Sequence, residues 1–114
     1  MTADQFIAGL EKLGAVERRA QPGGQVLAVL EAQPVKGTGR RSRVAFMLPN
    51  ELQGRPQHFV DGDMRTRSGG VPNNWATSVM GIDVFGTWSF NCAWDPASDA
   101  PEALALAVLS QWDR

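Results

Sequence analysis

The chain contains few of the side chains that build catalytic and metal sites. Its 114 residues include one cysteine, Cys92, and one histidine, His58. A lone cysteine excludes an internal disulfide and favours a reducing compartment, so a cytoplasmic location is expected. Any Ser–His or Cys–His catalytic system would have to use His58. The only lysines, Lys12 and Lys36, offer few acceptors for self-modification.

The chain also lacks long hydrophobic runs and a strong charge of either sign. No apolar run approaches the roughly 20 residues that span a bilayer, and the first residues form a polar helix-start pattern, so neither a membrane span nor a signal peptide is expected. The net charge of −1 provides no field to attract nucleic acid or an anionic membrane. The segment GTGRRS lacks the Lys-Ser/Thr ending of a phosphate-binding loop, and no serine nucleophile elbow occurs. No cofactor is predicted.

The length and composition of the chain predict one small domain covering residues 1–114. This length suffices to bury a core without disulfides, and the apolar fraction of 43% is well above that of disordered chains. Glycine and proline gather in the middle and are scarce at both ends, which predicts terminal helices around a sheet-containing centre.

Both predicted helices begin with a capping signature. Thr2 and Gln5 form a capping box before a helix over residues 3–13. Asp99, with Glu102 three residues later, is the expected N-cap of a C-terminal helix. Apolar residues of this second helix recur on one face, namely Leu104, Ala105, Val108, Leu109 and Trp112.

The centre predicts an antiparallel meander. Strands are expected over residues 25–31, 42–48 and 57–60, and the second places Val44, Phe46 and Leu48 on one face. Residues 61–74 are charged and glycine-rich and predict a long functional loop. The stretch 75–93 mixes apolar pieces with glycines and permits no assignment. Together these elements predict an α+β fold with about four strands.

Two segments carry a resemblance to a known family. The stretch LPNELQGRPQHFV is similar to the extended segment of ubiquitin-conjugating enzymes, and CAWDPASDAPEALALAVLSQW is similar to their Trp-x-Pro corner and following helix. The tryptophan-rich FGTWSFNCAWDPASD resembles the prokaryotic branch of this UBC/RWD-like family in particular. The resemblance implies a UBC-like fold with a long active-site loop between the meander and the C-terminal helix.

The resemblance also implies a function in a bacterial ubiquitin-like modification pathway. The chain would accept the C-terminus of a ubiquitin-like modifier as a thioester on Cys92 and transfer it to an amine. An activating-enzyme-like protein would deliver the modifier and dock on the N-terminal helix, and a deubiquitinase-like peptidase is a further implied partner. Asn73 or Asn91 would stabilise the oxyanion.

The chain departs from the family pattern in two places. Val71 stands where the family has a histidine before Pro72 and Asn73. The family's nucleophile position falls on Gly86, whereas Cys92 lies only two residues before Trp94. These departures leave open a second interpretation, a non-catalytic module that binds a modifier or partner protein, in which Cys92 is a core residue.

Aromatic residues near these motifs are candidates for binding. Trp75, Trp88, Trp94 and Asp95 could border a cleft for an extended peptide tail, or the tryptophans could fill the core beneath the final helix.

Two weaker interpretations remain. His58, Asp61 and Asp63 could bind a hard metal ion, although a structural histidine explains His58 as well. Two arginine clusters could form a groove for single-stranded nucleic acid with Trp75, or a solvated protein-docking face. These clusters comprise Arg40, Arg41, Arg43, Arg65 and Arg67.

Overall fold

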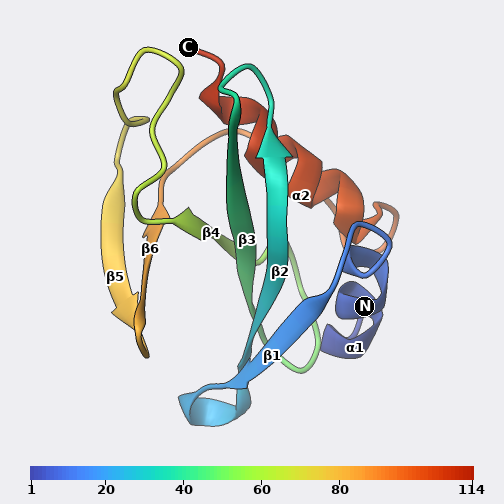
Figure 1. The fold of residues 1–114 in the computed structure, drawn as a ribbon. Helices are drawn as coiled ribbons and strands as arrows, with labels where there is room; N and C mark the ends of the chain where they lie inside the picture. Colours follow the sequence, from blue (N-terminus) through green and yellow to red (C-terminus); the bar gives the residue numbers. More distant parts are fainter.

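The computed structural model describes all 114 residues as two helices on one six-stranded sheet (Figure 1). The elements in chain order are α1 (Ala3–Leu10), β1 (Val16–Ala20), the short 3-10 helix η1 (Pro22–Gly24), β2 (Val26–Val35), β3 (Arg40–Leu48), β4 (Gln57–Asp61), β5 (Ala76–Met80), β6 (Asp83–Thr87), α2 (Pro101–Leu109) and the 3-10 helix η2 (Ser110–Trp112).

The predicted N-terminal cap is confirmed and the C-terminal one is wrong. The Thr2 hydroxyl accepts from the Gln5 amide, and the Gln5 side chain accepts from the Thr2 amide, so the capping box is complete. The N-cap of α2 is instead Ala100, which makes no side-chain cap. The Asp99 carboxylate instead accepts a hydrogen bond from the Asp95 amide at 2.7 Å. Pro101 suits the first position of α2, where an N–H is not needed.

All strand pairs in the sheet are antiparallel, in the order β1-β2-β3-β4-β6-β5. A bulge interrupts the β2–β3 pairing, because Leu30 pairs with Val44 and Gln33 with Ser42, leaving two residues of β2 opposite Arg43. The extra residue reverses which side chains face the helices. Leu30 and Val35 therefore both reach the helix-side core.

The predicted UBC-like fold is wrong. The chain forms six strands and not a four-strand meander, because residues 76–87 make an additional hairpin, β5–β6, that joins the sheet through β4.

The segment between β4 and β5 has no regular element, as predicted, but backbone hydrogen bonds attach it to the C-terminal residues. The Arg67 amide donates to the Trp112 carbonyl at 3.0 Å, and the Ser68 amide donates to the Arg114 carbonyl at 2.8 Å.

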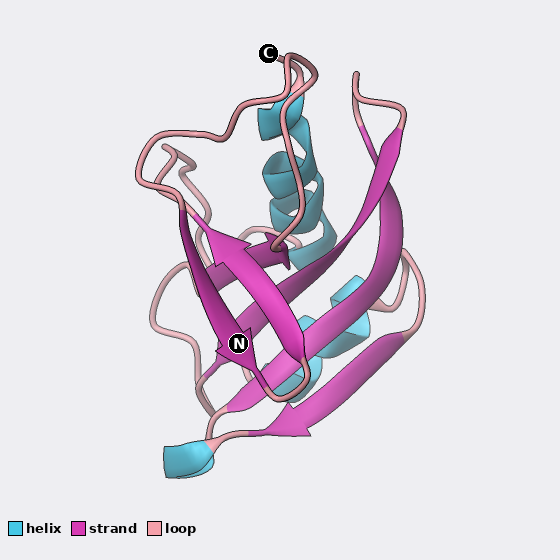
Figure 2. Cartoon of the chain, turned by 60° about the vertical axis from the view of Figure 1, so that its left-hand side comes forward, coloured by secondary structure: helices cyan, strands magenta, loops and turns pink.

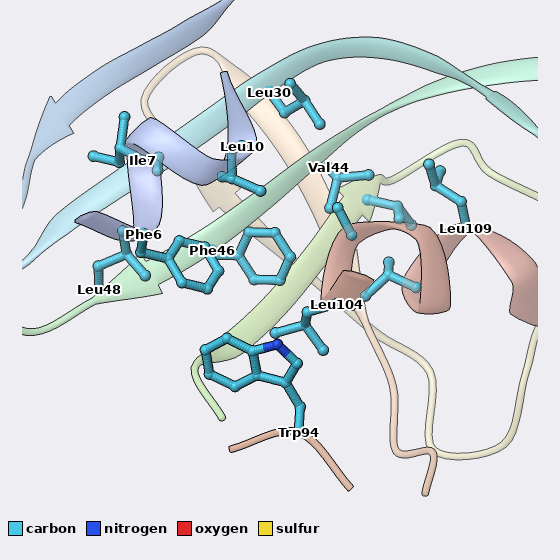
Figure 3. Packing of buried hydrophobic residues seen from close by; sticks show 14 of the residues in the cluster. Phe6, Ile7, Leu10, Leu30, Val44, Phe46, Leu48, Trp94, Leu104 and Leu109 are labelled. Atoms are coloured by element: carbon cyan, nitrogen blue, oxygen red, sulfur yellow. The ribbon is translucent and has the colours of Figure 1, made fainter. Parts of the chain in front are cut away.

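Both helices cover the same face of the sheet and bury the larger core (Figures 1 and 2). Figure 3 shows Phe6 of α1 and Leu104 of α2 meeting Phe46 of β3. The predicted face of β3 is confirmed, since Val44, Phe46 and Leu48 are fully buried here. The helices approach closely at Gly9, where a Cβ would lie 2.5 Å from the Pro101 ring.

The opposite face has a smaller core that no helix covers. Its five buried residues are Leu27, Val29, Ala45, Phe59 and Phe85. Charged side chains cover part of it, and the guanidinium groups of Arg19 and Arg43 lie 5.9 Å and 4.9 Å from the centre of the Phe85 ring. Arg19 of β1 also bonds Asp83 of β6 at 2.8 Å. Three strands separate β1 from β6, so this contact requires the sheet to curl around the smaller core.

Candidate functional site

The only histidine lies in a buried aromatic setting at the start of β4. His58 is 5% exposed and makes edge-on contacts with Trp88 and Phe90, with ring centroids 4.7 Å and 4.9 Å away. Burial, with a contribution from the Arg55 charge, lowers the pKa of His58 to about 4, and a hydrogen bond with the Trp88 backbone opposes this only in part. His58 is therefore neutral near pH 7. Its Nε2 is buried without a hydrogen-bond partner.

Arg55 ties the segment after β6 to the start of β4. Its Nη1 donates to the carbonyls of Phe90 and Cys92 at 3.2 Å and 3.4 Å, and its guanidinium lies 5.0 Å from the Phe90 ring centre. No carboxylate pairs with Arg55, in contrast to Arg18, Arg19, Arg43 and Arg67. An exposed cation held in one position is thus left with free donors.

These residues line a cleft of about 400 Å³ between the start of β4 and the segment that follows β6. We call it the Arg55 cleft. Asn74 and Ser89 lie at its wall together with His58 and Trp88, and most of the lining is polar. Trp88 Nε1 is a second buried polar atom without a partner. An indole N–H can only donate, as can the guanidinium of Arg55, whereas the neutral imidazole of His58 has an acceptor nitrogen. The cleft therefore suits a polar, negatively charged ligand that accepts hydrogen bonds and can also donate one.

Trp75 and Trp88, two of the predicted binding residues, meet in an aromatic cluster with Trp112. The ring centroids of Trp75 and Trp88 are 6.0 Å apart, and each lies against Trp112, at 5.6 Å and 4.9 Å. Trp88 lines the Arg55 cleft as well, so it takes part in both the core and the cleft. Gly86, the family's nucleophile position, lies directly beneath Trp75, and a Cβ there would be 2.0 Å from the indole.

The other two predicted binding residues, Trp94 and Asp95, lie at the corner that leads into α2. Trp94 is 8% exposed, packs edge-on against Phe6 and donates through Nε1 to the Ala100 carbonyl at 2.9 Å. The Asp95 carboxylate accepts from the Ala97 amide at 2.9 Å. Both side chains thus have structural partners in this corner.

The predicted catalytic residues are not joined by hydrogen bonds. Cys92 is a free, half-buried thiol packed against the helix-side core, and only its carbonyl bonds Arg55. Asn73 and Asn91 are exposed and make no side-chain hydrogen bond. The neighbouring Asn74, and not Asn73, lines the cleft. The role of Cys92 as a nucleophile stays a prediction.

Several residues considered for metal or nucleic-acid binding have other partners. No group of three His, Cys, Asp or Glu side chains is arranged to hold a metal ion. Asp61 pairs with Arg43 at 2.7 Å, and Arg43 also bonds Asp83 at 3.0 Å. Arg65 donates to the carbonyls of Gly62 and Met64.

A second hollow, of about 540 Å³, lies between α1 and residues 96–102. The resemblance assigns docking to this helix. The basic side chain that lines the hollow, Lys12, is already paired with Glu102 at 3.4 Å. The hollow therefore lacks the unpaired cation that distinguishes the Arg55 cleft.

Sequence reasoning missed Arg55. Its partners, the carbonyls of Phe90 and Cys92, lie 35 and 37 residues further along the chain. No local pattern reports such a contact. The one available signal was an arginine with no acidic residue beside it in GRPQHF.

Comparisons with protein families, curated proteins and solved structures find no match to this chain. No helix has the length and apolar character needed to cross a membrane.

Proposed function

We propose that this protein is a small non-catalytic binding module that holds the C-terminal tail of a partner protein in the Arg55 cleft. The observation that carries the proposal is the unpaired guanidinium of Arg55 beside the unpartnered, neutral imidazole of His58. A cation and a hydrogen-bond acceptor together match the end of a polypeptide, which offers a carboxylate and backbone N–H groups.

Arg55 supplies the carboxylate contact. Its Nη1 is occupied by two carbonyls, which leaves Nε and Nη2 free. A guanidinium presents such donors in a planar fork that fits both oxygens of a carboxylate. Because the bond to Phe90 and Cys92 fixes the side chain in advance, little conformational entropy is lost on binding.

His58 supplies the acceptor. The ring is neutral near pH 7, and its Nε2 has no hydrogen-bond partner. In a neutral imidazole with a proton on Nδ1, Nε2 accepts a hydrogen bond. Because Nε2 is buried beside Trp88 and Phe90, a backbone N–H of the bound tail would reach it only after one of these rings moves aside. Asn74 and Ser89 line the cleft and can contact the remaining polar groups.

The sequence resemblance suggests the class of partner. A ubiquitin-like modifier would present its C-terminal tail to the cleft, in a cytoplasmic setting consistent with a lone, unpaired cysteine. Binding in this way needs no thioester. Transfer through Cys92 would add a chemical step, but no general base or oxyanion donor is hydrogen-bonded to its thiol.

A peptide-binding experiment tests the proposal. Randomised hexapeptides with a free C-terminal carboxylate are compared with the same pool carrying a C-terminal amide, by calorimetry or tryptophan fluorescence. We expect the free acids to bind at least about tenfold more tightly, since a charge-assisted hydrogen bond contributes roughly 1.5–3 kcal/mol. Arg55→Gln should abolish the difference.

Two variants serve as controls. Arg41→Gln removes an exposed arginine that bonds only the Ala32 carbonyl, so it should bind like the wild type. Cys92→Ser should also bind normally, because the thiol does not line the cleft. Equal affinity for acids and amides would overturn the proposal, and loss of binding in Cys92→Ser would point back to the thiol.

A further inference from the structure

The two edges of the sheet differ in how they are protected. The β1 edge carries Glu17, Arg18 and Arg19 in five residues. Such charges prevent the unpaired backbone of an edge strand from adding another strand. The β5 edge, with the sequence ATSVM, has no charged residue and no proline. It is therefore open to pairing.

The register of the β5–β6 hairpin identifies the free backbone groups. The Gly62 amide donates to the Val84 carbonyl at 2.8 Å, so the backbone of Val84 faces β4. Val79 is opposite Val84 and exchanges no hydrogen bond with it, so the N–H and C=O of Val79 face solvent. The same holds two residues earlier, at Thr77. The edge thus presents two donors and two acceptors.

Apolar side chains lie along the same hairpin. Val79 is 75% exposed, its cross-strand neighbour Val84 is 48% exposed, and Ile82 in the turn is fully exposed. Gly81, with φ of 66°, supplies the first position of a type II′ turn and keeps the hairpin tight. Exposed valine beside an open strand edge favours another strand as the occupant.

We infer that β5 pairs with β5 of a second copy of this chain, antiparallel, across a twofold axis at Ser78. In this register Thr77 lies opposite Val79 of the second copy, and Val79 lies opposite its Thr77. The two donors and two acceptors of each edge are then satisfied by four hydrogen bonds. The arrangement is self-complementary, as a twofold interface requires.

The absence of charge on β5 permits a second copy as the occupant, and the small size of the strand makes the association weak. No charged side chain of β5 meets its own copy, so pairing brings no like-charge repulsion. Two five-residue strands bury much less than the roughly 1,000 Å² of a stable interface, so the dimer is weak and depends on concentration. This inference is independent of the Arg55 cleft and its ligand.

Sedimentation velocity from about 10 μM to about 1 mM tests the pairing. The wild type should shift from monomer to dimer over this range. Thr77→Pro removes an outward N–H that β6 does not use, and it should remain monomeric. Thr77→Val retains the N–H and should dimerise like the wild type.

Ser78→Lys provides a second test in case the proline variant fails to fold. It places two ammonium groups opposite each other at the axis, so dimerisation should weaken at low salt and recover at high salt. A wild type that stays monomeric at the highest concentration would overturn the inference. Dimerisation of a folded Thr77→Pro variant would do so as well.

Discussion

At the scale of single residues, His58 couples the core to pH. Its pKa is about 4 in the fold because burial disfavours the charged ring, whereas an exposed histidine titrates near 6.5. As pH falls below 6.5, the imidazole of His58 binds a proton in the unfolded chain but stays neutral in the folded chain. The folded state is therefore fully stable above pH 6.5 and loses stability as pH falls toward 4.

We expect the free energy of unfolding to drop by about 2 kcal/mol between pH 7 and pH 5. Urea denaturation at the two pH values measures this difference. A His58→Phe variant keeps an aromatic ring between Trp88 and Phe90 and removes the titration, so its stability should change little over the same range. A variant as pH-sensitive as the wild type would assign the effect to other groups.

Gly86 is required by the packing of Trp75. A Cβ at this position would lie 2.0 Å from the indole, which is confined by Trp88 and Trp112. Gly86→Ala should thus cost about 1–3 kcal/mol and shift the tryptophan emission. Gly54→Ala is the matched control, because no atom lies within 4 Å of a Cβ there. Equal melting temperatures for the two variants would contradict this interpretation.

At the scale of elements, local signals predicted the ends of the chain better than its middle. The capping box of α1 depends on Thr2 and Gln5, which are three residues apart, and it formed as predicted. The first predicted strand was expected to end at residue 31, yet β2 continues through Pro34 to Val35. It can do so because β1 pairs only as far as Leu30, so the missing N–H of Pro34 interrupts no ladder on that side.

The β5–β6 hairpin was not predicted because several of its apolar side chains face solvent instead of the core. Sequence interpretation assumes that apolar residues of a strand are buried, whereas Val79, Ile82 and Val84 are exposed. Without that hairpin the sequence predicts a meander of about four strands, whereas the sheet has six. The same exposed side chains are what mark β5 as a pairing edge.

The Arg55 cleft could be predicted only in part. Trp88, which the tryptophan-rich stretch made a candidate, lines the cleft, and the Cys92 carbonyl accepts a hydrogen bond from Arg55. The pairing of Arg55 with Phe90 and Cys92 depends on the path of the chain through β5 and β6, which no local pattern determines.

At the scale of the whole molecule, an ion-pair network closes the sheet. Five charged residues lie on the curled face, namely Glu17, Arg19, Arg43, Asp61 and Asp83. In a flat sheet β1 and β6 would lie about 19 Å apart, at about 4.8 Å per strand. Hydrogen bonds from Arg43, and next from Arg19, lower the pKa of Asp83, so its carboxylate stays charged at neutral pH and loses this stabilising role only in acid.

Asp83→Asn should loosen this closure without unfolding the core. Arg19 loses its partner on β6, whereas Arg43 keeps Asp61, so amide hydrogen exchange should accelerate in β1 and β6 and stay slow in β2 and β3. Glu17→Gln removes a more exposed carboxylate that pairs only within β1, and it should leave exchange in β6 unchanged. If both variants exchange alike, the curl depends on the apolar contacts around Phe85 alone. A selective opening of β6 would show that charge holds the two halves of the sheet together.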